Sequence, residues 1–189
     1  KLTDFLDPRE RFIVSSIVGQ NDDLTIVEEG VFEKAERKRL YICPSYFTPN
    51  SSDFNISIYS VNYPSKFVQI GHPDVLGATL SLGLDRMKFG DIRVNENAAQ
   101  FAVVSEIADY VERNLISIGK VKVHLNQLEI HENLIQSKEE WIEKSYTVSS
   151  KRIDVILANV LNISRQKSQM LINAGKVKVN WTVRESTSF

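Results

Sequence analysis

Apolar residues recur along the chain at two spacings, one typical of helices and one typical of strands. Near the start, Asp7-Pro8-Arg9-Glu10 forms a capping-box sequence, which predicts a helix that ends near Val18. Three runs that favour strands follow, at residues 24–27, 40–43 and 54–59. Residues 1–63 are therefore expected to form a small mixed α/β unit.

Residues 64–131 alternate between strand-like and helix-like patterns. The predicted order is strand, helix, strand, strand, helix, strand, at 67–70, 73–84, 91–94, 100–105, 106–117 and 121–125. This βαββαβ order is the ferredoxin-like arrangement, whose two helices cover one sheet face and leave the other free for a partner. RNA-recognition modules stack bases on aromatic residues of such a face, but the strand at 100–105 lacks the paired aromatics.

A polar connector is expected at 132–146, and residues 147–189 then predict two short helices and a strand. The first helix has an apolar stripe made of Ile153, Ile156, Leu157, Val160 and Leu161. Ser164 suits the N-cap of the second helix, and Gly175 suits its C-terminal end. The chain is therefore expected to be an α+β protein whose last part is an incomplete two-helix-plus-strand module.

Charge is unevenly distributed between these parts. The whole chain has a net charge of −1, but residues 147–189 carry seven basic and two acidic residues, an excess of +5. A local excess of positive charge concentrates near polyphosphate and steers its association. A well-solvated surface is the alternative explanation, since charge alone does not make a binding site.

The basic residues of the last part fall at positions that suit phosphate. Arg165 and Lys167 lie in the first turn of the second helix, where cations oppose the helix dipole unless an anion is bound there. Lys176 and Lys178 alternate with valines, so both lysines leave the same face of the strand. Arg152, at the head of the first helix, could complete this patch.

Other candidate residues give less specific signals. Arg86 and Lys88 lie in a Gly-bounded connection, where exposed cations commonly bind ligands, and are secondary candidates. Asp85 and Asp91 have no catalytic partner at a recognisable spacing, so no catalytic residue is expected. Neither the three histidines nor the single cysteine, Cys43, shows a metal-ligand pattern. We therefore expect no metal, no cofactor and no small-molecule substrate.

Location and completeness can also be predicted from the sequence. No apolar run reaches the roughly 18 residues of a membrane-spanning helix, so the sequence predicts no membrane contact and a cytoplasmic protein. Because the chain begins at Lys1 instead of Met, we expect it to be a piece of a longer polypeptide.

Several of these residues recur in a known pattern. Arg152-Ile153-Asp154, then Ser164-Arg165, then Leu171-Ile-x-x-Gly-x-Val-x-Val-Asn180 resemble the RNA-binding domain named after the fourth protein of the small ribosomal subunit. Together with Gly71-His-Pro-Asp-Val-Leu-Gly77 and Phe89-Gly-Asp-Ile92, they make nearly the whole chain similar to the YlmH family of bacterial RNA-binding proteins.

This resemblance implies a non-catalytic protein that binds structured RNA, either ribosomal RNA or tRNA, on large-subunit particles. Its relatives include factors that act on stalled large subunits, so a role in rescuing stalled translation is also implied. The implied RNA face consists of Arg152, Arg165, Lys167, Lys176, Lys178 and Asn180.

The chain departs from the family pattern at three places. Ser168 takes the position of a small Ala, Trp181 replaces a Gly that often follows Val-Asn, and the closing strands after Phe189 are absent. Trp181 could stack on a base, or it could be a half-packed hairpin residue. It is a secondary candidate for RNA binding.

Two alternative functions belong to different classes. The same module is often attached to pseudouridine synthases, which would make the upstream part catalytic, but residues 64–131 are too few for such a domain. The basic C-terminal part could instead dock an acidic protein partner, in the manner of an adaptor. Salt dependence and competition by RNA would separate RNA binding from protein docking.

Overall fold

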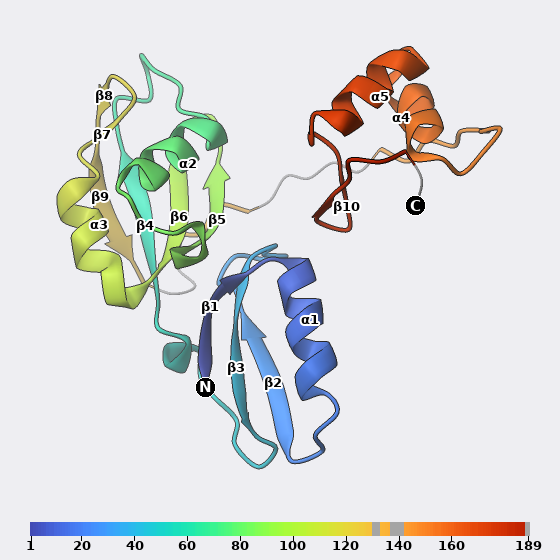
Figure 1. Cartoon of the computed structure of the whole chain (residues 1–189). Coiled ribbons are helices and arrows are strands. Elements are labelled where there is room, and N and C mark those ends of the chain that lie inside the picture. The colour runs from blue at the N-terminus through green and yellow to red at the C-terminus, as the bar shows by residue number, and fades with distance from the viewer. Residues whose placement is uncertain (130–132, 137–141, 188–189) are drawn as a thin grey trace. The chain divides into compact units, whose positions relative to one another are not determined.

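Figure 1 shows the computed structural model, which describes residues 1–129, 133–136 and 142–187. The chain divides into two compact units, Lys1–Lys138 and Glu139–Phe189, and each is described by itself. Of the connector expected at 132–146, residues 132 and 137–141 lie outside the described residues. His131 lies outside them as well.

A three-stranded antiparallel sheet opens the first unit, in the order β1 (Leu2–Leu6), β3 (Lys38–Pro44), β2 (Leu24–Glu29). The predicted helix, α1 (Pro8–Val18), follows β1 and begins with the predicted capping box. Asp7 Oδ1 accepts the amide of Glu10 at 2.9 Å, and the Glu10 carboxylate accepts the amide of Asp7 at 2.7 Å. Strand β1 was not predicted, and its pairing with β3 is interrupted by a bulge between Leu2 and Phe5.

A second sheet contains four strands in the order β5-β6-β4-β9, and all neighbours are antiparallel. Along the chain its elements are β4 (Ile56–Asn62), α2 (His72–Ser81), β5 (Phe89–Val94), β6 (Ala99–Val104), α3 (Ala108–Asn114) and β9 (His124–Leu128). Three short 3-10 turns lie at Ser51–Phe54 (η1), Arg86–Lys88 (η2) and Ser105–Ile107 (η3), and β7 (Ser117–Ile118) pairs with β8 (Val121–Lys122). From β4 to β9, the helices and the strands of this sheet thus follow a βαββαβ order.

The first and last strands of that order differ from the predicted ones. Residues 67–70 are turn and irregular chain, and Phe67 is 87% exposed, so the predicted strand there is wrong. Its place in the sheet is taken by β4, which carries buried apolar residues on both faces, as a central strand requires. The strand predicted at 121–125 is split between the β7–β8 hairpin and β9.

Apolar side chains cover both faces of the second sheet. On one face, α2 and α3 (Figure 1) pack over a core that contains Tyr59, Phe101 and Val103. On the other, Ile58 and Ala102 are fully buried with residues of the N-terminal segment, among them Phe5, Phe32 and Phe54. The expectation that this second face is free for a partner is therefore wrong, because the N-terminal segment covers it.

Buried polar contacts tie the three-stranded and four-stranded sheets of the first unit together. The Arg39 side chain, only 3% exposed, donates to the carbonyls of Thr3, Phe54 and Asn55 at 2.7 to 2.8 Å. The Asp91 carboxylate accepts the amides of Glu36 and Arg37, each at 2.9 Å. These bonds satisfy backbone groups that burial would otherwise leave without a partner.

The second unit contains the predicted pair of helices, α4 (Ile153–Leu161) and α5 (Arg165–Asn173), which pack against each other (Figure 1). Ile153, Val155 and Ile172 are buried between them or beside them. A hairpin of β10 (Lys178–Val179) and β11 (Thr182–Val183) follows, so the single predicted strand is one arm of a two-stranded ribbon. Gly175, with φ +65°, separates α5 from this hairpin.

Candidate nucleic-acid interface

The start of α5 places two of the predicted cations in solvent. Ser164 caps the helix as predicted, because its Oγ accepts the amide of Lys167 at 3.2 Å. The side chains of Arg165 and Lys167 are both exposed in the first turn, Arg165 to 55%. The first turn of a helix bears a partial positive charge, and two cations there make a site that favours an anion.

A buried carboxylate connects this helix start to the head of α4. Asp154 has no exposed surface, and it accepts hydrogen bonds from Arg152, Arg165 and Gln169. Arg152 Nε donates to Oδ1 at 3.0 Å, whereas Arg165 Nε and Gln169 Nε2 each donate to Oδ2 at 2.8 Å. The hydrogen bonds from Arg152, Gln169 and Arg165 hold the pKa of Asp154 well below its usual range. The carboxylate is therefore ionised at neutral pH and fixes both arginines.

This arrangement orients the outer ends of the two guanidinium groups. Arg152 also donates from Nη2 to Thr187 Oγ1 at 2.7 Å, and its side chain is 46% exposed. Among the residues that the structure describes, Nη1 of Arg152 and both Nη atoms of Arg165 make no hydrogen bond. Both groups can thus bind a ligand such as phosphate without losing the bonds that hold them.

The predicted lysines lie on the segment that follows α5, Lys176 just before β10 and Lys178 at its start. Lys176 and Lys178 are exposed, while Val177 and Val179 are partly buried, which confirms the predicted alternation. The amide of Lys176 donates to the carbonyl of Leu171 at 3.0 Å, so the segment is anchored on the end of α5. Within the described part of the chain, Lys167, Lys176 and Lys178 form no ion pair.

The remaining predicted residues of this unit, Asn180 and Trp181, occupy the turn of the β10–β11 hairpin. Val179 pairs with Thr182, so these two residues form the whole loop, with φ angles of +50° and +61°. Both are exposed, Trp181 to 43%. The structure thus brings Arg152 and Arg165 together through Asp154, and it places the lysines, Asn180 and Trp181 on the hairpin and the segment leading to it.

The secondary candidates Arg86 and Lys88 lie in η2 of the first unit, and their donors are engaged within the protein. Arg86 donates to the carbonyls of Phe89 and Gly90, and burial, with Arg37 nearby, lowers its pKa to about 10. Lys88 forms an ion pair with Asp4 at 2.8 Å. These contacts tie η2 to neighbouring strands.

Asp154 and Gln169 were not among the predicted site residues. A sequence signal for Asp154 was present, since it is a carboxylate between Ile153 and Val155 on a helix whose inner face is otherwise apolar. Such a residue is rarely buried without a cationic partner. Nothing local pointed to Gln169, because its partner is 15 residues away in the sequence.

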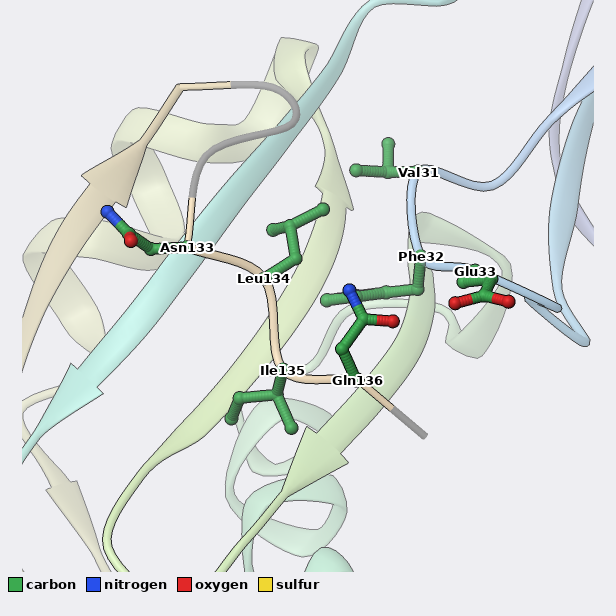
Figure 2. Close-up of a pocket in the computed structure, with 7 residues that line it drawn as sticks. All are labelled: Val31, Phe32, Glu33, Asn133, Leu134, Ile135 and Gln136. Carbon is green, nitrogen blue, oxygen red and sulfur yellow. The ribbon is translucent and has the colours of Figure 1, made fainter. Parts of the chain in front are cut away.

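A surface pocket of about 450 Å³ lies elsewhere, in the first unit (Figure 2). Figure 2 shows Asn133–Gln136 running opposite Val31, Phe32 and Glu33, and these seven residues line it. The segment is held by Gln100, which donates to the carbonyl of Asn133 at 2.9 Å and accepts the amide of Ile135 at 2.8 Å. The lining offers a carboxylate and amides but no cation, so its chemistry does not suit phosphate.

Metal-ligand clusters and membrane-spanning helices are both absent from residues 1–129, 133–136 and 142–187. In these ranges, no three His, Cys, Asp or Glu side chains are grouped so that they could hold a metal ion. Within the same ranges, no helix has both the length and the apolar character needed to cross a bilayer.

Comparison with known proteins identifies relatives of both units. Residues 49–132 match a family model described as "Putative RNA-binding domain in YlmH", and residues 151–189 match the S4 domain. The chain is 43% identical over all 189 residues to "Ribosome-associated protein quality control protein P2" of Bacillus subtilis (strain 168), of which it covers 73%. The solved structure "Cell division protein ylmH from Streptococcus pneumoniae" is 30% identical with a TM-score of 0.60, over 71% of this chain and 82% of that one.

Proposed function

Because the chain belongs to the YlmH family, with its RNA-binding domain and C-terminal S4 domain, we propose that it binds structured RNA through the second unit and catalyses no reaction. The observation that carries this proposal is a pair of exposed arginines held on buried Asp154, Arg152 at the head of α4 and Arg165 at the start of α5. We call Arg152, Arg165 and Lys167, together with Lys176, Lys178 and Asn180, the cationic face.

The chemistry of this face suits the sugar-phosphate backbone. A phosphate near the start of α5 would meet the positive end of the helix and the guanidinium of Arg165, which can donate two parallel hydrogen bonds. Lys176 and Lys178 supply point charges along the adjoining segment, as a continuous phosphate chain requires. Placing two cations in the first turn of α5 is unfavourable for the isolated helix, and a bound phosphate would offset that cost.

The partner we propose is ribosomal RNA or tRNA on the large ribosomal subunit, in the cytoplasm. The Bacillus subtilis relative is named for ribosome-associated protein quality control, and its 43% identity extends over the whole of this chain. We propose that this protein acts in the same process, which includes rescue of stalled translation. The positive excess of residues 147–189 supports a polyanionic partner.

For the first unit, we propose a ferredoxin-like domain around the four-stranded sheet. Its support is the βαββαβ order with the strand order β5-β6-β4-β9, in which every neighbour is antiparallel. Since β4 pairs with β6 and β9, we propose that this domain begins before Ile56, upstream of the limit at residue 63 or 64 that the sequence indicates. Base stacking on its second face is not part of the proposal, since apolar residues cover it.

A pseudouridine synthase is a poorer explanation. Both matched family models describe RNA-binding domains. The two aspartates considered for catalysis have structural contacts: Asp85 Oδ1 accepts the amide of Met87 at 2.9 Å, and Asp91 accepts two backbone amides and the guanidinium of Arg93. Nothing in the described residues favours an adaptor for an acidic protein over RNA binding, and competition by free ribosomal RNA separates the two functions.

The test of the proposed function is the double substitution Arg165→Ala and Lys167→Ala in the full chain. We expect it to weaken binding to purified large ribosomal subunits by about 10- to 100-fold, because two exposed phosphate contacts are lost. Each lost contact should also reduce the slope of log K against log salt by about 0.7 to 0.9. Co-sedimentation at several salt concentrations measures both quantities.

The matched control is Lys66→Ala and Lys120→Ala, which removes two exposed cations from the first unit. We expect wild-type binding from this control. Equal weakening by both double variants would show that only total charge matters, and would contradict the assigned site. If free ribosomal RNA does not compete for the protein, the large-subunit partner it recognises is a protein, as the adaptor function requires.

A further inference from the structure

The turn of the β10–β11 hairpin contains a tryptophan, Trp181, at a position that requires positive φ. Lys178 pairs with Val183 and Val179 with Thr182, so Asn180 and Trp181 alone connect the strands. Both have positive φ, +50° and +61°, as a type I′ turn requires at its two central positions. This turn is favoured in short hairpins because its twist matches that of the strands.

The two turn residues differ in how well they tolerate this backbone. Asn visits the left-handed region readily, because its short polar side chain bonds locally. Glycine is the favoured residue at the second position, since any Cβ there approaches the following carbonyl oxygen. Trp181 therefore adopts a conformation that costs free energy and that glycine would adopt without this cost.

The Trp181 side chain lies at the surface, near exposed cations of the segment that leads to it. Trp181 is 43% exposed, so much of its ring surface is in contact with solvent. These cations are Lys176 and Lys178, and Asn180 beside Trp181 is exposed as well. An exposed aromatic ring next to cations is the combination by which proteins hold unpaired nucleotides.

We infer that Trp181 stacks on an unpaired base of the bound RNA, while Lys176 and Lys178 hold the phosphates that flank this base. The inference rests on the proposed RNA-binding function and adds the class of ligand: a bulged, looped or single-stranded nucleotide. Bases within a continuous duplex already stack on each other and offer no free face to the indole. Since every base has such a face, the contact requires an unpaired base but no particular sequence.

The test uses two synthetic RNA duplexes that differ only in one unpaired 2-aminopurine bulge. We expect the wild-type protein to bind the bulged duplex more tightly and to quench its fluorescence. Trp181→Ala and Trp181→Gly should each weaken binding to the bulged duplex by about 5- to 150-fold and abolish the quenching. Their affinity for the fully paired duplex should not change, and Trp181→Phe should keep most of the preference.

Thermal unfolding of the two small-residue variants tests the argument from backbone strain. Both lack the ring, but only glycine tolerates positive φ freely, so Trp181→Gly should melt at a higher temperature than Trp181→Ala. A glycine variant that melts no higher than the alanine variant would remove the strain from the argument and overturn the inference.

Two binding results would also overturn it: full affinity of Trp181→Gly for the bulged duplex, or equal losses on both duplexes. In either case the Arg165→Ala, Lys167→Ala variant shows whether the proposed function fails as well. If that double variant still loses affinity for both duplexes, RNA binding by the cationic face stands and only the stacking by Trp181 is wrong.

Discussion

Arg39 and Arg86 of the first unit differ from Arg152 and Arg165 of the second in the direction of their donors. In the first unit, the donors of Arg39 and Arg86 point inward to backbone carbonyls. In the second, Arg152 and Arg165 are held from within by Asp154, and their outer donors reach solvent. Only the second pair therefore has donors that can reach a ligand without breaking the contacts that hold the side chain.

The largest effect that this comparison predicts is on the stability of the first unit. Arg39→Leu removes the guanidinium donor from the carbonyls of Thr3, Phe54 and Asn55, of which only Asn55 keeps a second donor, the Ser105 amide, and should lower the free energy of unfolding by about 3 kcal/mol. Urea unfolding followed by circular dichroism measures this loss. Lys88→Ala breaks an ion pair whose two side chains are both about a third exposed, and should cost at most about 0.5 kcal/mol. A similar loss in both variants would contradict the structural role given to Arg39.

A smaller effect is expected on RNA binding when Asp154 is replaced by Asn. The substitution removes a negative charge from the RNA-binding unit, so charge alone predicts tighter binding. If Asp154 acts by orienting Arg152 and Arg165, affinity for large ribosomal subunits should instead fall about tenfold. Asp22→Asn, at an exposed position of the first unit, is the control for loss of one negative charge. Tighter binding by the Asp154 variant would refute the positioning role.

The most gradual effect is the response of the second unit to acid. The pKa of Asp154 is lowered in the folded state. The stabilisation that the ionised carboxylate provides is therefore present above the pKa of an unfolded Asp, about 3.9, and is lost as the pH falls through the lower pKa of the folded state. We expect amide NMR signals of α4 to lose intensity below about pH 4. The Asp154→Asn variant should lack this acid step. Retention of the step in the variant would assign it to another carboxylate.

Local signals made part of this structure predictable from the sequence. The capping box at Asp7 and the N-cap at Ser164 each involve residues three apart, so the starts of α1 and α5 follow from a few neighbouring letters. The alternation of lysine and valine before Asn180 likewise placed the lysines in solvent. These features depend on contacts within one turn or one strand.

The features that escaped prediction depend on contacts between distant residues. A strand was predicted at 54–59, but only the pairing of β4 with β6 and β9 shows to which sheet it belongs. Arg86 and Lys88 looked like exposed loop cations, and their internal partners appear only when η2 is packed against β5 and β1. Asp154 joins residues from 152 to 169, and such a cluster has no fixed spacing that a sequence pattern could reveal.

The shared carboxylate has a consequence for how the second unit tolerates sequence change. Arg152 and Arg165 have one anionic partner between them, so losing either leaves the other as the sole cation paired with Asp154. Their substitutions should be epistatic, with a coupling of about 0.5 to 3 kcal/mol in a double-mutant cycle of stability. Aspartate and the two arginines would accordingly be expected to vary together among sequences descended from this one, as a single inherited unit.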